Sequence, residues 1–363
     1  SNDGNYVLAG EMSADAYIYC FRADDGNLMW KYRAADDTGT YTGSYSWYKP
    51  KVMDIVVSDN EVYSVAYRYW KEKVNGTKYY YYNSTIYKFN IENGEVIWKI
   101  TDIDSGVYKL SIDSNDHLVF ATSAWDNRPR EYPSGSIYYL NVKNTPEFLW
   151  NYTIEPTEYK KYVSIWKGIS ISQNGEYVAV LTGLGRAFLF NSEGNLLWAK
   201  NISTPIEISG ITIYGYGDEA HVTNNEVIFA VGSTFKTAGG RPGGIEHPSA
   251  TSLFSYDMNG NLKWKWKVDG YPDYLSLSED GRYLAVSVAQ NIITEDTEIH
   301  GAYIFDLERP GGASAKLSWF YHTDGVGVTI DISPDGKYIA FIEAPVTKSD
   351  GETIGEHKLH ILL

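Results

Sequence analysis

The chain has 363 residues, a hydrophobic share of 43 % and a formal net charge of −15. The hydrophobic content suffices for a packed core and excludes an intrinsically disordered chain. The charge argues against nucleic acid as a partner, because phosphate binding needs basic side chains that displace counterions, and it disfavours anionic membrane surfaces in the same way. No stretch of 18 apolar residues occurs, so this segment is not expected to insert into a membrane.

A turn motif recurs along the chain and marks where strands begin. Its clearest copies are Ser172-Gln-Asn-Gly-Glu-Tyr177, Ser278-Glu-Asp-Gly-Arg-Tyr283 and Ser333-Pro-Asp-Gly-Lys-Tyr338. Asn-Gly and Asp-Gly supply the positive φ that a tight hairpin turn needs, and an apolar run typical of a strand follows each of them. The motif and its looser copies predict strands that begin near residues 6, 62, 118, 177, 227, 283 and 338, at intervals of 50 to 59 residues.

Each copy continues with a variable loop, an aromatic third strand, another tight turn and a fourth strand that carries a tryptophan. The first copy runs from Tyr17 to Phe21, turns at Gly26 and reaches Trp30. A large aromatic side chain at one fixed place per repeat is expected to pack between neighbouring repeats, as architecture. The residues at this place are Trp30, Trp98, Trp150, Trp198, Trp264 and Trp319. Residues 144–146 and 310–312 replace the standard turn before Trp150 and Trp319.

Seven such four-stranded antiparallel units cannot bury their faces alone, whereas radial stacking buries them and protects their edges. We therefore expect an all-β fold, a seven-bladed β-propeller that forms a single domain over residues 1–363. Ser1 aligns with the residue that closes a first strand, and Leu363 falls within a third strand. We expect blades 1 and 7 to be incomplete in this chain, and the chain to be part of a longer protein.

Two motifs resemble known propeller repeats. The pattern Phe21-Arg-Ala-Asp-Asp-Gly26-Asn-Leu-Met-Trp30 resembles the PQQ-like repeat, and Ser333-Pro-Asp-Gly-Lys-Tyr338 resembles WD40-like and surface-layer type repeats. The resemblance covers nearly the whole chain and implies a fold, not an activity. Quinoprotein dehydrogenases share the tryptophan-bearing repeat but usually have eight blades and a vicinal disulfide over their cofactor. This chain has one cysteine, Cys20, so the resemblance implies no bound cofactor.

The sequence indicates no catalytic, cofactor-binding or metal site. The histidines are scattered, and the close pair His357 and His360 falls on opposite faces of a strand. Neither a Gly-x-Ser-x-Gly elbow nor a Cys–His pair occurs, and residues 239–244 lack the lysine of a phosphate-binding loop. Carboxylates from different blades can still meet in a propeller. A hydrolase or lyase with a carboxylate and histidine site at the channel mouth is therefore the alternative.

The long connections identify one end of the repeats as the candidate binding face. Turns after the first and third strands are short, whereas the loops after the second strand and between repeats are long in most copies. These long segments are rich in Tyr, Trp and Arg, which give large contact areas at low entropic cost and also stack on sugar rings. The candidate ligand face comprises Tyr45, Trp47, Tyr48, Trp70, Trp125, Tyr132, Tyr162, Trp166, Tyr216, Arg241 and His247.

The sequence thus predicts a non-catalytic binding or scaffold propeller that recognises a protein or a glycan through its long loops. We expect it at the cell surface or outside the cell, while the low cysteine content fits the cytoplasm as well. Four N-glycosylation sequons occur, among them Asn75-Gly-Thr. That number is close to what the composition alone produces, so it does not decide the location.

Overall fold

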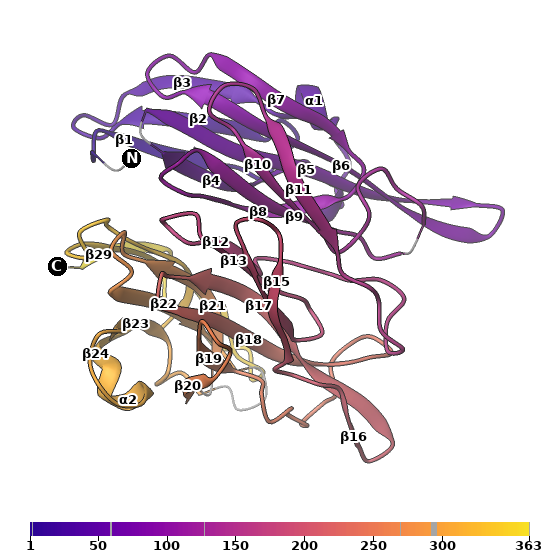
Figure 1. Ribbon diagram of the computed structural model, residues 1–363, viewed down its shortest axis with the longest axis vertical. Helices are drawn as coiled ribbons and strands as arrows, with labels where there is room; N and C mark the ends of the chain where they lie inside the picture. The colour runs from indigo at the N-terminus through magenta and orange to yellow at the C-terminus, as the bar shows by residue number, and fades with distance from the viewer. Residues whose placement is uncertain (2, 59, 127, 269, 292–295, 363) are drawn as a thin grey trace. The chain divides into compact units, whose positions relative to one another are not determined.

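The computed structural model describes residues 1, 3–58, 60–126, 128–268, 270–291 and 296–362. Antiparallel sheets account for nearly all of the regular structure in these residues (Figure 1). The chain divides into two compact units. Unit 1 comprises Ser1–Val178 and Ser192–Gly194, and unit 2 comprises Ala179–Asn191 and Asn195–Leu363.

Unit 1 contains three sheets, whose strands follow one another along the chain. They are formed by β1 (Tyr6–Gly10), β2 (Tyr17–Arg22) and β3 (Leu28–Arg33); by β4 (Lys51–Ser58), β5 (Glu61–Val74), β6 (Thr77–Asn90) and β7 (Val96–Ile103); and by β8 (Gly106–Ile112), β9 (His117–Ser123), β10 (Ser136–Asn141) and β11 (Glu147–Thr153). The short helix α1 (Ala35–Thr38) and the single 3-10 turn η1 (Ser46–Tyr48) lie between β3 and β4. A fourth sheet, whose residues are shared between the units, comprises β12 (Ile169–Ile171), β13 (Tyr177–Leu181), β14 (Arg186–Asn191) and β15 (Leu196–Asn201).

Unit 2 continues the same order of strands. Its sheets are formed by β16 (Ile206–Ile208), β17 (Ile211–Val222), β18 (Glu226–Lys236), β19 (Ser252–Asp257) and β20 (Leu262–Lys267); by β21 (Tyr271–Leu277), β22 (Tyr283–Ala289), β23 (Gly301–Asp306) and β24 (Leu317–His322); and by β25 (Val326–Ile332), β26 (Ile339–Ala344) and β29 (Lys358–Leu362). Helix α2 (Ala313–Lys316) precedes β24, and the hairpin of β27 (Val346–Thr347) and β28 (Thr353–Ile354) follows β26.

The strands that follow the repeated turn motif begin at residues 6, 61, 117, 177, 226, 283 and 339. These starts differ by at most one residue from those expected. The four-strand rule is wrong for the sheet of β16–β20, which carries a short fifth strand. There β17 extends to 12 residues, and its N-terminal part pairs with β16 as well as with β18.

Hydrophobic cores lie between successive sheets within each unit. In unit 1, Trp30 and Phe89 share one core and Val65 and Phe120 share the next. In unit 2, Trp264 and Phe305 stack in the core between the sheets of β16–β20 and β21–β24. A sheet covered on both faces needs apolar residues at successive positions rather than at alternating ones. This explains the nearly continuous burial along strands such as β5 and β9.

The first strands of successive sheets are joined by a contact that the sequence did not reveal. The accepting strands are β4, β8, β17 (which follows the short β16) and β21. Each has a β-bulge against the next strand of its own sheet, and a side chain near the bulge accepts a backbone N–H from the first strand of the following sheet. The bonds run from Leu110 to Asp54 at 2.8 Å, from Ile171 to Ser111 at 3.1 Å, from Leu275 to Glu219 at 3.1 Å and from Ile332 to Ser276 at 3.3 Å. Side-chain acceptors thus provide partners for backbone donors where ladder pairing is irregular.

Three of the repeat tryptophans make one shared contact to the following sheet. Each indole N–H donates to a backbone carbonyl just beyond the penultimate strand of that sheet. The pairs are Trp30 with Ile91 at 2.7 Å, Trp150 with Ser192 at 2.9 Å and Trp198 with Met258 at 3.1 Å. The glycine of the same turn lies against the ring; at Gly94 (φ +72°) a Cβ atom would stand 2.6 Å from Trp30. The turn glycine and the preceding tryptophan therefore form one packing unit.

Lysine replaces tryptophan as the donor where unit 1 has a non-standard turn. The Nζ atom of the buried Lys88 donates to the carbonyls of Val142 (3.0 Å) and Lys143 (3.2 Å) and pairs with Glu61 at 2.6 Å. The indole N–H of Trp98 is buried and has no hydrogen-bond acceptor among the described residues. The turn at 144–146, which the repeat pattern had already set apart, is the one beside this lysine.

In unit 2 a lysine again donates to this carbonyl, but it lies between the last two strands of the acceptor's own sheet and not in the preceding sheet. Lys316, buried in α2, donates to the carbonyls of Leu307 and Arg309, beside the irregular turn at 310–312. The indole N–H of Trp264 then bonds the Glu226 carboxylate at 3.2 Å. The backbone carbonyl just beyond the penultimate strand of a sheet thus accepts a hydrogen bond in both units, while the side chain that donates to it differs.

Candidate binding surface

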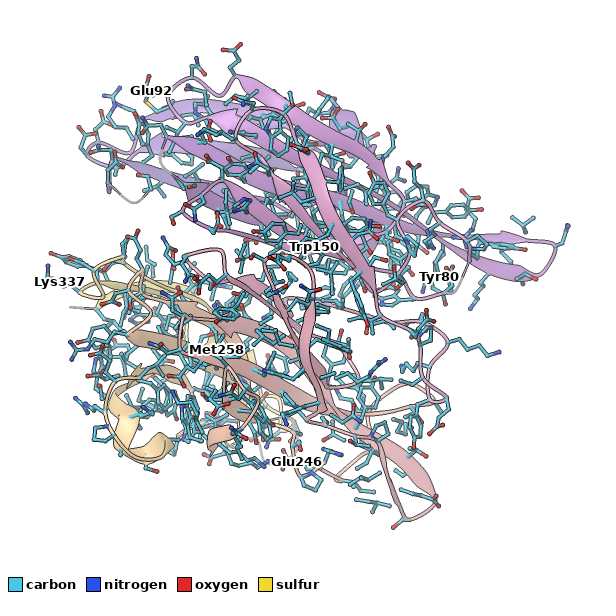
Figure 2. The ribbon with its side chains drawn as sticks, viewed as in Figure 1. Tyr80, Glu92, Trp150, Glu246, Met258 and Lys337 are labelled. Atoms are coloured by element: carbon cyan, nitrogen blue, oxygen red, sulfur yellow. The ribbon has the colours of Figure 1, made fainter. Side chains whose placement is uncertain are left out.

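Strands β5 and β6 of unit 1 continue well beyond their neighbours. Each has 14 residues, and they pair from Glu61 and Asn90 to Val74 and Thr77. Pairing with β4 ends at Tyr67, and pairing with β7 begins only at Ser84. Residues 68–83 therefore form a two-stranded ribbon that projects from its sheet, with Tyr80 near its base (Figures 1 and 2).

The ribbon corrects the expectation that Trp70 belongs to a loop. Trp70 lies in β5, opposite Tyr81 of β6. The two strands are joined by Asn75 (φ +50°) and Gly76 (φ +85°), which is the positive-φ pair of a two-residue hairpin turn. The Asn-Gly pair is a strong hairpin signal, and counting it only as a glycosylation sequon conceals the ribbon.

One face of the ribbon packs on the loop that follows β9. The ring of Tyr69 lies 4.8 Å from that of Trp125 in an edge-on contact, and the backbone N–H of Trp125 donates to the Tyr82 hydroxyl at 3.0 Å. Arg130 donates to the carbonyl of Tyr80 at 3.2 Å. A two-stranded ribbon has little stability alone, so these contacts hold it in place.

The other face carries cations stacked on aromatic rings. Trp70 and Tyr81 stack with their centroids 5.4 Å apart. The Arg68 guanidinium lies 4.8 Å from the Trp70 ring and that of Arg128 lies 4.7 Å from the Tyr81 ring. These four side chains are half-buried, and Asp126 pairs with Arg128 at 3.0 Å. Such stacks order long side chains before any ligand arrives.

The 3-10 turn beside the ribbon presents two aromatic side chains to solvent. Tyr45 and Trp47 are 49 % and 51 % exposed. Two cations hold the carbonyl end of the turn: Lys51 donates to the carbonyl of Trp47 at 3.4 Å, and Arg68 donates to that of Tyr48 at 3.3 Å. Cations are favoured at the carbonyl end of a helical turn. We call Tyr45, Trp47, Arg68, Trp70, Tyr81 and Arg128 the turn–ribbon surface.

Lys51 is the buried member of this arrangement. Its ammonium group lies 4.5 Å from the Trp47 ring and 5.5 Å from the Tyr67 ring, and among the described residues no carboxylate pairs with it. Burial lowers the pKa of Lys51 to about 8. A buried amine without a counter-ion is easier to deprotonate because water no longer solvates its charge.

Stability should therefore rise with pH through Lys51. Between its folded pKa of about 8 and its usual value of 10.5, the unfolded chain binds a proton that the folded chain does not. The free energy of unfolding of the wild type, relative to that of Lys51→Met, is expected to increase over this window and to be constant below it. Urea titrations at several pH values check this. A difference that falls as pH rises would contradict it.

Three further residues of the predicted face lie in unit 1 as packed, half-buried side chains. Trp166 lies 4.2 Å from Tyr108, centroid to centroid, and Tyr132 lies 5.5 Å from Tyr138. Tyr162 lies under the ammonium group of Lys160 at 5.5 Å. They belong to the same unit as the turn–ribbon surface and have no large exposed area of their own.

The remaining three predicted residues lie in unit 2. Tyr216 is part of β17, not of a loop, and packs on Phe235 at 5.7 Å; Arg241 is exposed and lies 5.5 Å from the same ring. His247 is buried, with an exposed fraction of 4 %. Its Nε2 bonds the carbonyl of Thr204 at 3.0 Å, and its Nδ1 accepts the N–H of Ser249 at 3.1 Å. Burial lowers the pKa of His247, and this neutral side chain ties two loops together.

Histidines meet carboxylates in pairs. His117 contacts Asp113 at 2.8 Å, His221 contacts Glu219 at 3.0 Å and His360 contacts Glu343 at 2.9 Å. His360 also bonds the Tyr321 hydroxyl at 3.0 Å, a contact that spacing along the sequence could not reveal. Within the described ranges, no group of three or more His, Cys, Asp or Glu side chains is arranged to hold a metal ion. No helix in those ranges is long and apolar enough to cross a bilayer.

Comparison with solved structures identifies the architecture. The β-propeller domain of Cps50 (Swd1) from Myceliophteria thermophila superposes with a TM-score of 0.58 at 10 % identity, over 99 % of this chain and 94 % of that one. A chain in the crystal structure of the mitotic checkpoint complex superposes with a TM-score of 0.59 at 10 % identity, over 98 % and 87 %. The fold is a β-propeller. No protein-family model matches the propeller, and no curated protein matches it in sequence.

Proposed function

We propose that the propeller is a non-catalytic scaffold that binds a protein partner through the turn–ribbon surface. The observation that carries this proposal is the exposed pair Tyr45 and Trp47 on a turn held by Lys51 and Arg68. Large aromatic side chains that are exposed yet fixed lose little entropy on binding, and Trp, Tyr and Arg dominate the energetics of interfaces. The β-propeller fold is compatible with this proposal but does not specify it, because one fold can carry many different functions.

The proposal also covers the number of blades, the type of repeat, the location of the protein and a second class of ligand. We infer that the successive sheets are seven blades of one propeller domain of the PQQ-like or surface-layer type, with the first and last blades three-stranded. We place the protein at the cell surface or outside the cell. A glycan is the second candidate ligand, because the exposed face of Trp47 suits stacking against a sugar ring.

Replacement of the exposed aromatic residues tests the proposal. The Trp47→Ala/Trp70→Ala double variant is expected to retain bound proteins from an extract of the source cells about tenfold less than the wild type. The matched control is Phe148→Ala, which removes an aromatic ring of similar exposure (45 %) from β11. Quantitative mass spectrometry of the retained proteins measures the loss, and far-UV circular dichroism checks the fold.

The outcomes are distinct. Equal retention by the double variant and the wild type would contradict the proposal. Loss in Phe148→Ala to the same degree would also contradict it, because binding would then not be specific to the turn–ribbon surface. Binding to a glycan array that depends on Trp47, without retention of any protein, would select the glycan instead.

A further inference from the structure

The ribbon has an open edge on the side of β5. In the part of the chain that the structure describes, no strand pairs with β5 beyond Tyr67, so residues 68–74 present one edge without a neighbouring strand. Alternate backbone N–H and C=O groups along such an edge point away from the ribbon, where an extended chain can pair with them. A glycan has no comparable ladder of donors and acceptors.

This edge is basic in an acidic protein. Residues 68–82 contain four basic side chains, Arg68, Lys71, Lys73 and Lys78, and one acidic side chain, Glu72, so the segment carries +3 while the whole chain carries −15. Residues 71–78 are exposed. A positive segment on a negatively charged protein attracts acidic groups to itself, while the rest of the molecule repels them.

Arg68 is the unpaired cation at the base of the edge. It is half-buried between the rings of Tyr41 (6.0 Å) and Trp70 (4.8 Å), and burial lowers its pKa. Its Nε–H bonds the carbonyl of Tyr48, and among the described residues no carboxylate lies within ion-pair distance of it. Its outer N–H groups match a carboxylate, and a partly desolvated site strengthens that pairing.

We propose that residues 68–74 bind an acidic, extended segment of a partner protein as an added antiparallel strand, with one of its carboxylates on Arg68. The proposal rests on the proposed function and specifies its partner. Main-chain pairing supplies affinity in this mode, and alternate side chains supply specificity. Apolar side chains of the segment lie on the Trp70 and Tyr81 rings. Edge lysines also protect strands from unwanted pairing, which is the competing explanation for Lys71 and Lys73.

A synthetic peptide tests the proposal. The probe is a fluorescein-labelled peptide of about ten residues that alternates Glu and Val, long enough to cover the edge. Fluorescence anisotropy is expected to show binding that weakens when salt is raised from about 20 mM to about 200 mM. Arg68→Gln is expected to weaken binding about tenfold, as loss of a charge-assisted hydrogen bond does, and Lys71→Glu/Lys73→Glu is expected to weaken it further.

Matched controls separate this mode from simple charge attraction. Lys337→Glu/Lys358→Glu makes the same charge change as Lys71→Glu/Lys73→Glu at two exposed lysines of unit 2 and should leave binding unchanged. A peptide with Lys in place of Glu, and the acidic peptide with alternate backbone nitrogens methylated, should not bind. Equal binding of the methylated peptide, or displacement of the probe by heparin without any dependence on backbone pairing, would overturn the proposal in favour of a polyanion site. Absence of binding by the acidic peptide would support the protective role of the lysines.

The two proposals fail separately. If Arg68→Gln and Lys71→Glu/Lys73→Glu still retain the proteins that Trp47→Ala/Trp70→Ala loses, the scaffold function stands and the acidic strand is wrong. If no aromatic variant loses any protein, the scaffold function itself is wrong.

Discussion

Replacement of Gly94 by alanine is expected to destabilise the protein by about 2–5 kcal/mol. Two costs add at this position. An alanine at φ +72° is strained by about 1–2 kcal/mol. Its Cβ would also stand 2.6 Å from the Trp30 ring, so the ring or the turn must move, at a further cost of about 1–3 kcal/mol. Urea unfolding followed by tryptophan fluorescence measures the loss.

Gly26 provides a matched control. It occupies the equivalent turn of the first sheet with φ +69°, and apart from its chain neighbours no described residue has an atom within 4 Å of its would-be Cβ. Gly26→Ala should therefore show the backbone strain alone, about 1–2 kcal/mol. Equal losses in the two variants would show that the glycine is needed only for its φ angle and that the contact with Trp30 has no energetic weight.

Replacement of Glu61 by alanine is expected to destabilise the protein by about 3 kcal/mol. Lys88 is 1 % exposed and pairs with Glu61 at 2.6 Å, so the variant leaves a buried ammonium group without its counter-ion. The expected loss of stability lies at the lower end of the range that is usual when one partner of a buried ion pair is removed, for two reasons. Two carbonyls still accept hydrogen bonds from Lys88, and the Glu61 carboxylate is itself 31 % exposed.

A double variant shows whether the buried charge is the cause. In Glu61→Ala/Lys88→Met the unpaired ammonium group is gone, so part of the loss should be recovered even though a second polar group has been removed. Additive losses from the two single substitutions would contradict this account. Glu61→Gln, which keeps an acceptor for the Tyr63 hydroxyl, should lie between the wild type and Glu61→Ala.

Local signals sufficed to place the start of one strand in each repeat. The turn motif that ends at Tyr177 or Tyr283 marks the start of a strand. Its glycine has the positive φ of a tight hairpin turn, and the next strand begins directly after such a turn. The place of Trp30 in a core between sheets followed from repetition alone, since one large ring per repeat has few other places to go. The comparison with solved propellers agrees with the fold class that these signals predict.

Contacts between residues far apart in sequence could not be predicted in this way. The bond from Leu110 to Asp54 joins strands 56 residues apart, and nothing near Asp54 marks it as an acceptor for a bulge. His247 was placed on the binding face because its loop is long, yet its side chain is buried and its ring nitrogens bond the backbone of Thr204 and Ser249. A single sequence reports the type of a side chain, but only packing decides whether its polar atoms face water or protein.

The carbonyl at the joint between sheets has a consequence for how such chains diverge. Trp30 reaches it with an indole in one place, and Lys88 reaches the equivalent carbonyl with an ammonium group in another. Because the acceptor belongs to the backbone, it persists whichever side chain supplies the proton. Trp98 accordingly keeps its place in the core although a lysine has taken the hydrogen bond. The tryptophan of a repeat can therefore lose its polar contact while its ring still fills the space between two sheets.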